Sequence, residues 1–323
     1  MIPLLEIASL SVGYGQGPVL REVSLRVNSG DVLGLVGESG CGKTTLGLAI
    51  LGLLPEYAEI RGRILFAGRD LFSMSKSERR ALLGERMTTV PQSSSNALDP
   101  VYTIGNQMIE AFLAHRTMTR ASARELAVQW LRNVGIPAPE TRLKAYPHEI
   151  SGGTRQRVSI ATALALNPSL LIADEPTSAL DVTIQAQILR LLRVLIRDHA
   201  GGVLLITHDL GVVAHLCNRV AVMYAGQIVE EAGVTRLFTA PAHPYTKALL
   251  ASHPARAKPG QRLATIPGRV PDPSNVPRGC SFRPRCPLAQ DACVELPPWA
   301  EARPEHFVRC VLYDETKHAA TGR

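Results

Sequence analysis

Residues 32–45 read VLGLVGESGCGKTT, and this stretch decides the fold. The apolar run Val32–Val36 predicts a short buried strand, and the apolar stretch Leu46–Leu54, followed by Pro55, predicts a helix. The segment between them matches G-x-x-x-x-G-K-[ST], whose glycines let consecutive backbone N–H groups surround phosphates. The helix adds the positive end of its dipole. We therefore expect a strand, a phosphate-binding loop and a helix in succession.

Two side chains of this loop are expected to act directly on a nucleoside triphosphate. Lys43 would bring a mobile positive charge to the β and γ phosphates, and the hydroxyl of Thr44 would hold Mg²⁺. Cys41 occupies a variable position of the pattern, so inert packing is a better interpretation than a redox role. The residues expected to bind the nucleotide are Gly37, Ser39, Gly40, Cys41, Gly42, Lys43, Thr44 and Thr45.

A second apolar run ends in two carboxylates. Leu170–Ala173 predicts a buried strand, and Asp174 and Glu175 follow it directly. Asp174 would face the metal, and Glu175 would polarise an attacking water. Two acids at a strand end can also form a solvated turn, but the run PTSALD, residues 176–181, follows at once. We therefore expect catalytic carboxylates here.

The flanking sequence alternates between strand and helix patterns. Residues 4–27 alternate apolar and polar side chains around glycines, which predicts antiparallel strands. Residues 75–166 are charged and helical in pattern, which predicts a mainly helical subdomain. The helix Val182–Asp198 and the strand Val203–Thr207 restore the rhythm of a buried parallel sheet, and Arg219–Glu231 predicts a hairpin.

Composition excludes two other classes of protein. No apolar run approaches the roughly 20 residues that cross a bilayer, and the first residues lack an export signal, so we expect a cytoplasmic protein. The net charge of +7 lies largely C-terminal to Pro254 and forms no long basic run. Without a basic stripe interleaved with aromatic residues, we expect no nucleic-acid partner.

Together these motifs resemble the ATP-binding cassette (ABC) family along nearly the whole chain. ADEPTSALD at 173–181 is highly specific, and ISGGTRQR at 150–157 is similar to the family signature. Ile150 and Thr154 depart from the usual residues, but the Ser-Gly-Gly donors remain. The resemblance implies an α/β fold of P-loop NTPase type, with a mixed sheet core, an antiparallel β subdomain and a helical subdomain.

The resemblance also implies roles in an ATP site shared by two subunits. Gln92 matches the metal-sensing glutamine, His208 the switch histidine at the γ-phosphate, and Tyr14 the aromatic residue on which adenine stacks. Structural roles are the alternative for all three. The implied sets are Glu175, His208 and Gln92 for catalysis, Thr44, Gln92 and Asp174 for Mg²⁺, Ser151, Gly152, Gly153 and Gln156 for the partner's ATP, and Asp181 for communication between sites.

The C-terminal segment is expected to need a cross-link for folding, because it is rich in proline and arginine. A segment so small seldom folds without disulfides or a bound metal. Disulfides are disfavoured in the cytosol, and the paired C-x-x-C knuckles of a zinc ribbon are absent. Four thiolates suit a [4Fe–4S] cluster, while Zn²⁺ and free thiols remain open. The cysteines are Cys280, Cys286, Cys293 and Cys310, and Arg278, Arg283, Arg285 and Arg309 would offset the charge of a cluster.

Motifs in the same segment make the chain resemble one particular group within the ABC family. HPYTKALL at 243–250, IPG at 266–268 and CSFRPRCPLAQDAC at 280–293 resemble the C-terminal extension of oligopeptide and dipeptide importer ATPases, and the resemblance links that extension to an iron–sulfur cluster. It implies an ABC domain over residues 1–250 and an extension over residues 251–323.

The implied partners follow from that family. They are a paralogous ATPase in a heterodimer, two permease subunits at the cytoplasmic face of the membrane, and, indirectly, a solute-binding protein. Residues 93–105 would face the permease. The alternatives are an importer of nickel chelates, a soluble cassette ATPase acting on ribosomes or nucleic acid, and a redox sensor.

Overall fold

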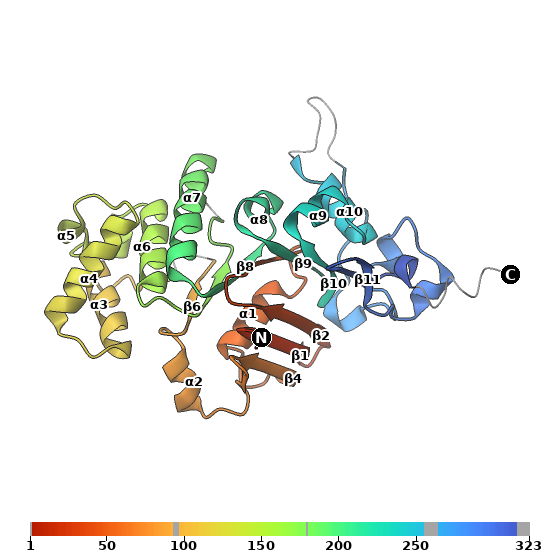
Figure 1. The fold of residues 1–323 in the computed structure, drawn as a ribbon, viewed down its shortest axis with the longest axis horizontal. Coiled ribbons are helices and arrows are strands. Elements are labelled where there is room, and N and C mark those ends of the chain that lie inside the picture. Colours follow the sequence, from red (N-terminus) through yellow and green to blue (C-terminus); the bar gives the residue numbers. More distant parts are fainter. Residues whose placement is uncertain (1, 93–96, 179, 255–263, 315–323) are drawn as a thin grey trace. The chain divides into compact units, whose positions relative to one another are not determined.

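The computed structural model describes residues 2–92, 97–178, 180–254 and 264–314, and they form two compact units (Figure 1). What we call the helical unit spans Met1–Leu5, Val27–Val32 and Phe66–Leu205. What we call the phosphate-loop unit spans Glu6–Arg26, Leu33–Leu65 and Ile206–Arg323. The domain boundary predicted near residue 250 stays a prediction.

Two sheets organise the phosphate-loop unit. In the first, strand order is β2-β1-β4, and burial alternates along β1 as expected for a strand with one face on the core. In the second, β3 pairs in parallel with β9, and β9 and β10 form the predicted hairpin around Ala225 and Gly226, which have φ of 43° and 79°. The bounds are β1 Leu5–Gly13, β2 Pro18–Val27, β3 Val32–Val36, β4 Glu59–Phe66, β9 Arg219–Tyr224 and β10 Gln227–Gly233.

The C-terminal extension continues the second sheet. Strand β12 pairs antiparallel with β10, and β11 pairs antiparallel with β12. In the described part of the extension, the other regular elements are short 3-10 helices, as its many prolines favour. The bounds are β11 Ala300–Arg303, β12 His306–Val308, η3 Pro273–Asn275, η4 Arg283–Arg285, η5 Asp291–Val294 and η6 Val311–Tyr313.

Helix α1 (Lys43–Leu51) follows β3, as predicted, but its bounds differ from the expected Leu46–Leu54. It begins at Lys43 because the turn of the loop feeds directly into it, and it ends at Gly52, whose φ of 65° terminates the helix before Pro55. The remaining helices of this unit are α8 Leu210–Leu216, α9 Val234–Thr239 and α10 Pro244–Ala251.

The helical unit combines a helix cluster with a pair of parallel strands. Strand β6 (Met87–Val90) pairs in parallel with β7 (Leu170–Asp174), so the predicted mainly helical region 75–166 also contains a strand. Met87 and Val90 are buried, which a strand this short achieves only inside a sheet. β8 (Gly202–Thr207) spans the sequence boundary between the two units.

Figure 1 shows α3, α4, α5 and α6 gathered in this unit, where Phe112, Trp130 and Leu131 are buried. Helix α7 buries Ile188, Leu192 and Leu195, a stripe at helical spacing. In the described part of the chain, no helix is both long and apolar enough to cross a bilayer. The bounds are α2 Lys76–Leu82, α3 Ile104–His115, α4 Arg120–Asn133, α5 Pro139–Arg142, η1 Pro147–Glu149, α6 Gly152–Leu164 and α7 Val182–His199, with the short strand β5 at Arg69–Asp70.

Candidate nucleotide-binding site

The loop between β3 and α1 has a shape that only glycine permits at three positions. Gly40 and Gly42 have φ of 79° and 107°, in the left-handed region that glycine adopts without strain. A Cβ at Gly37 would lie 2.2 Å from the carbonyl oxygen of Met223. The glycines therefore keep the loop tight and lead it directly into α1, whose positive N-terminal end attracts an anion.

Lys43 is held over this loop by its own backbone. Its side chain is only 7% exposed, and Nζ donates to the carbonyl oxygens of Gly37 at 2.8 Å and Glu38 at 3.0 Å. Thr44, by contrast, is exposed at the start of α1, and Ser39 is exposed in the loop. A buried, hydrogen-bonded ammonium beside exposed hydroxyls is an arrangement that can bind phosphate and coordinate Mg²⁺.

Cys41 packs into the interior beneath the loop. The residue is 1% exposed, its carbonyl oxygen accepts from the N–H of Gly226 at 2.9 Å, and burial raises the pKa of its thiol. A thiol that stays protonated is a poor nucleophile. These features favour the packing interpretation over the redox one.

Two further predicted residues lie elsewhere in the phosphate-loop unit. Tyr14 follows β1, and its ring meets the edge of Tyr57 with centroids 6.1 Å apart. Its ring is partly exposed, as a stacking platform for adenine requires. His208 is exposed immediately after β8.

The helical unit brings Gln92 and Glu175 together. The parallel register of β6 and β7 pairs Val90 with Ala173, so the segments that follow the two strands leave the sheet side by side. Gln92 Nε2 donates to Glu175 Oε2 at 3.4 Å, and Ser178 Oγ donates to the backbone carbonyls of Gln92 at 3.1 Å and Glu175 at 3.0 Å.

Glu175 also has an unusual backbone conformation. Its φ is 45°, in the left-handed region that costs a non-glycine residue about 1 kcal/mol or more. The turn held by Ser178 keeps Glu175 in this conformation at the end of β7, beside the half-buried Asp174. The strand end therefore presents its two carboxylates in the adjacent positions that the sequence predicts.

The signature segment forms the start of α6. Ser151 is the N-cap, and its Oγ accepts from the N–H of Thr154 at 3.2 Å and lies 2.9 Å from the Thr154 hydroxyl. Thr154, which departs from the family pattern, thus reinforces the cap. A Cβ at Gly153 would lie 2.8 Å from Ile184 Cγ2, while Ser151 stays exposed.

The structure adds information on two predicted site residues, Gln156 of the signature and Asp181 of the following loop. Gln156 is 3% exposed, so it is the least accessible of the four signature residues. Asp181 is exposed and caps α7, because its side chain accepts from the N–H of Ile184 at 3.0 Å. Its predicted role between sites stays a prediction.

The four C-terminal cysteines line one small cavity, together with Arg283 and His243 among others. All are free thiols, and burial is the main cause that raises the pKa of Cys310, to about 11. No group of three His, Cys, Asp or Glu side chains in the described residues could hold a single metal ion. The cysteines thus converge without forming a mononuclear site.

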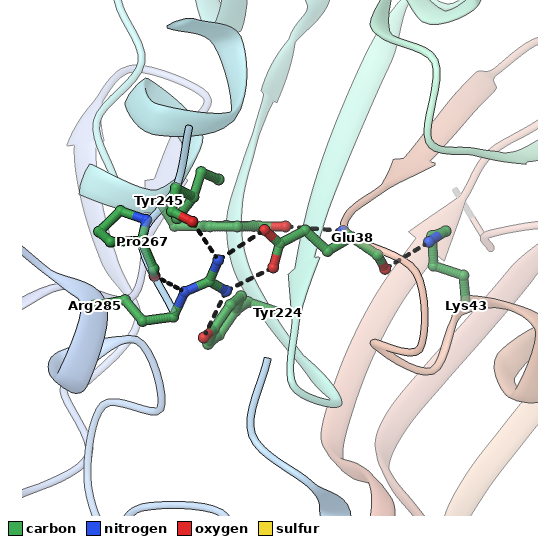
Figure 2. Close-up of polar contacts among 7 residues, drawn as sticks. Glu38, Lys43, Tyr224, Tyr245, Pro267 and Arg285 are labelled. Atoms are coloured by element: carbon green, nitrogen blue, oxygen red, sulfur yellow. Dashed lines mark hydrogen bonds and ion pairs between the residues drawn. The ribbon is translucent and has the colours of Figure 1, made fainter. Parts of the chain in front are cut away.

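Two arginines expected to offset the charge of a cluster have other partners. Arg285 forms an ion pair with Glu38 of the phosphate loop, through Nη1 at 2.6 Å and Nη2 at 3.0 Å (Figure 2). The Arg309 guanidinium lies over the Trp299 ring, 5.8 Å from its centroid. The Arg285–Glu38 pair joins residues 247 positions apart, and no local sequence signal points to it.

A buried carboxylate that sequence analysis missed anchors the extension. Glu230 is 0% exposed and accepts from the N–H groups of Ala242 at 2.7 Å and His243 at 2.8 Å, and from His306 Nε2 at 2.7 Å. Burial alone would raise the pKa of Glu230, but these hydrogen bonds outweigh it and lower the pKa. One side chain thereby joins β10, the start of α10 and β12.

Comparisons with known proteins agree with these motifs. A family model described as ABC transporter matches residues 20–178, and one described as the oligopeptide/dipeptide transporter C-terminal region matches residues 229–293. A probable peptide ABC transporter ATP-binding protein of Sinorhizobium fredii is 50% identical over 316 residues, covering 95% of this chain and 94% of the relative. The chain belongs to the ABC transporter family. The dipeptide transport ATP-binding protein DppD of Escherichia coli is 45% identical over 295 residues, covering 90% of each chain.

The fold of this ABC ATPase agrees with solved cassettes. An ATP-binding cassette in a dimeric, post-hydrolysis state bound to ADP and Pi is similar with a TM-score of 0.64 and 25% identity, covering 71% of this chain and 98% of that one. The P-loop NTPase fold is therefore confirmed, and the chain is an ATP-hydrolysing enzyme of ABC type. ATP with Mg²⁺ fits such an enzyme.

Proposed function

We propose that this ABC ATPase powers the import of peptides, or of a related small solute, through a membrane permease. The observation that carries the proposal is the phosphate loop and the peptide-transporter type of extension in one chain, matched along nearly its whole length by ATP-binding proteins named for peptide and dipeptide transport. Those relatives do not favour the soluble ATPase on ribosomes or nucleic acid.

In this proposal the described side chains take the following parts. Lys43 and the backbone of the loop bind the phosphates, Thr44 and Asp174 hold Mg²⁺, and Tyr14 stacks on adenine. The 3.4 Å contact between Gln92 and Glu175 supports their working on one metal-bound phosphate and its attacking water. His208 would contact the γ-phosphate.

The partners proposed are a paralogous ATPase subunit and two permease subunits, at the cytoplasmic face of the membrane. The exposed, capped Ser151 at the start of α6 supports a donor role toward ATP held by the partner ATPase. A separate solute-binding protein would select the cargo. Of the segment expected to face the permease, residues 93–96 lie outside the described residues.

We also propose a [4Fe–4S] cluster in the cavity lined by Cys280, Cys286, Cys293 and Cys310. The convergence of four free thiols on one cavity supports it. A single zinc ion needs its four ligands about 2.3 Å away, and the described residues do not form such a group. In a [4Fe–4S] cluster each thiolate binds a different iron, which suits wider spacing. When bound, the cluster would cross-link the extension.

Hydrolysis by Glu175 can be tested with one substitution. Glu175→Gln should bind Mg·ATP like the wild type but hydrolyse it about 10²- to 10⁴-fold more slowly, because general-base assistance is lost. Phosphate release and nucleotide binding are measured on the same preparation, with Glu125→Gln on the exposed face of α4 as control. Near-normal turnover would reassign the base.

The transport assignment and the cluster need separate experiments. Tagged protein should co-purify with integral-membrane permease subunits, and cells carrying Glu175→Gln should lose uptake of labelled peptides. Anaerobically purified protein should be brown and carry about four irons per chain, and Cys286→Ser should lose both. A colourless protein with one zinc would refute the cluster without touching the ATPase.

A further inference from the structure

The phosphate loop of this chain contains an acidic residue, Glu38, close to where the negatively charged phosphates of a nucleotide would bind. Glu38 lies between Gly37 and the residues that surround the phosphates, and a carboxylate there repels a polyphosphate. In the structure its side chain points away from Lys43 and toward Arg285, while its backbone carbonyl takes the bond from Lys43 Nζ at 3.0 Å (Figure 2). The orientation of Glu38 therefore determines both the conformation of the loop backbone and the position of a negative charge that is unfavourable for phosphate binding.

Arg285 uses every donor it has, two of them on that carboxylate. Nη1 and Nη2 make the two bonds to Glu38, Nη1 also donates to the Tyr224 hydroxyl at 3.3 Å, and Nη2 donates to the carbonyl of Ile266 at 3.3 Å. Nε donates to the carbonyl of Pro267 at 2.7 Å. These contacts use the five N–H groups of a guanidinium, a set that lysine cannot supply. The side chains of Arg285 and Glu38 are 6% and 24% exposed, so water screens the pair little.

The neighbours of the pair fix it from both sides. Glu38 N–H donates to the Tyr245 hydroxyl at 2.9 Å, and the rings of Tyr224 and Tyr245 pack on Phe282, with centroids 5.2 Å and 5.3 Å away. Phe282 precedes η4, which ends at Arg285, and Cys286 follows and lines the cysteine cavity. The segment that forms the cavity thus also places the guanidinium.

The extension makes a second contact near the loop that carries Tyr14. A Cβ at Gly17, whose φ is 115°, would lie 2.5 Å from the carbonyl oxygen of Pro273. The extension therefore touches the segment after Tyr14 as well as the phosphate loop. Both contacts lie inside the phosphate-loop unit.

We propose that Arg285 of the C-terminal extension is a positioning residue for ATP: it holds the Glu38 carboxylate away from the bound phosphates and fixes the loop backbone that carries Lys43. The inference rests on the proposed ATP site, and it gives the extension a role in nucleotide affinity. In this arrangement any change that displaces η4 releases the Glu38 carboxylate toward the nucleotide.

The test is a double-mutant cycle on the full chain, with equilibrium binding of fluorescent Mg·ATP analogue as the readout. Arg285→Gln should raise the Kd about tenfold, or ~1.4 kcal/mol, because Glu38 is then a free negative charge in the loop. Glu38→Gln should leave the Kd within about threefold of wild type, and the double variant should recover to the same level. Arg269→Gln, on the exposed surface of the extension, is the matched control and should change nothing.

The outcomes separate this inference from a purely structural role and from the proposed ATP site. If wild type binds the analogue and Arg285→Gln binds equally well, or if the double variant stays as weak as Arg285→Gln, the inference is overturned. If wild type binds no nucleotide, the ATP site itself fails. Thermal unfolding is recorded for each variant, and Arg285→Lys replaces Arg285→Gln if the latter does not fold: it should weaken binding by about threefold, and adding Glu38→Gln should abolish that loss.

Discussion

The phosphate loop and the C-terminal extension arrange their polar groups in opposite ways. The loop leaves the Thr44 and Ser39 side chains exposed and keeps one charge, Lys43, on its own backbone carbonyls. The extension buries two of its polar side chains against partners distant in sequence, Arg285 on Glu38 and His306 on Glu230. The loop is prepared for a ligand, whereas these two side chains of the extension already have partners. Substitution should therefore reduce affinity in the first and, apart from Arg285, which contacts the loop, stability in the second.

The largest effect should come from Glu230, the buried carboxylate of β10 that anchors the extension. Glu230→Gln replaces the carboxylate acceptor of three buried hydrogen bonds with an amide, and each buried donor left unsatisfied costs about 1–3 kcal/mol, or about 3–5 kcal/mol in all. Urea unfolding followed by circular dichroism gives the free energy, with Glu125→Gln as the exposed control. A loss under about 1 kcal/mol would mean that the extension does not depend on this anchor.

The next effect concerns the pH dependence of stability. Burial is the main cause that lowers the pKa of His243 from 6.5 to about 4, and its Nε2 has no partner among the described residues. Between those values the unfolded chain binds the proton and the folded chain does not, so stability falls as pH drops from 6.5 toward 4, by about 3 kcal/mol.

The matched variant for this pH effect is His243→Asn. Asparagine does not titrate, and it can still cap α10, where His243 Nδ1 now accepts from the Tyr245 N–H at 3.0 Å. Its unfolding free energy should therefore vary less over that pH range. The Glu230 carboxylate, whose pKa is lowered from 4.5, adds to the loss of stability only as the pH falls through about 4.5, at the acid end of that range and below it. An equal slope in wild type and variant would assign the loss to other groups.

A smaller effect is expected in the loop itself. Lys43→Ala removes a charged donor to the phosphates and to the carbonyls of Gly37 and Glu38, which should cost about 2 kcal/mol of binding, or roughly 30-fold in Kd. Calorimetric titration with Mg·ATP measures it, and Lys144→Ala on an exposed site is the control. Unfolding free energy should change little. A large loss of stability with unchanged affinity would contradict the view that the loop serves binding and not stability.

The smallest effect should appear where the phosphate loop contacts α10, the helix that leads into the extension. Tyr245→Phe removes the hydroxyl that accepts from the Glu38 N–H at 2.9 Å, and one neutral hydrogen bond is worth about 1 kcal/mol. We expect the Kd for Mg·ATP to rise about fivefold, with Tyr102→Phe, an exposed residue, as control. An unchanged Kd would show that the loop keeps its shape without this contact.

The same contrast explains which parts of the molecule the sequence could predict. Gly37, Gly40, Gly42 and Lys43 act through short-range backbone geometry, so a local pattern identifies them. Strand β7 and the acids that end it could also be predicted from a local pattern, because a buried apolar run is followed directly by acidic residues. The hairpin β9–β10 was predicted from its turn residues.

What the sequence could not predict depends on partners far along the chain. The pairing of Arg285 with Glu38 could not be predicted, because the folding of the extension brings together residues 247 positions apart. Its role in offsetting the charge of a cluster stays a prediction. Strand β6 was missed because four residues between charged helices give no reliable period. The anchor at Glu230 was missed since its partners come from three separate elements.

The pairing of β12 with β10 has a consequence for any shortened form of this protein. Strand β10 is buried almost throughout, and without the extension its outer backbone N–H and C=O groups would face solvent as a ready template for another chain. The natural margin, β11, is instead short, carries Glu301 and Arg303, and is followed by Pro304, all features that discourage intermolecular pairing. A cassette cut after residue 250 would therefore aggregate before its chemistry could be assayed.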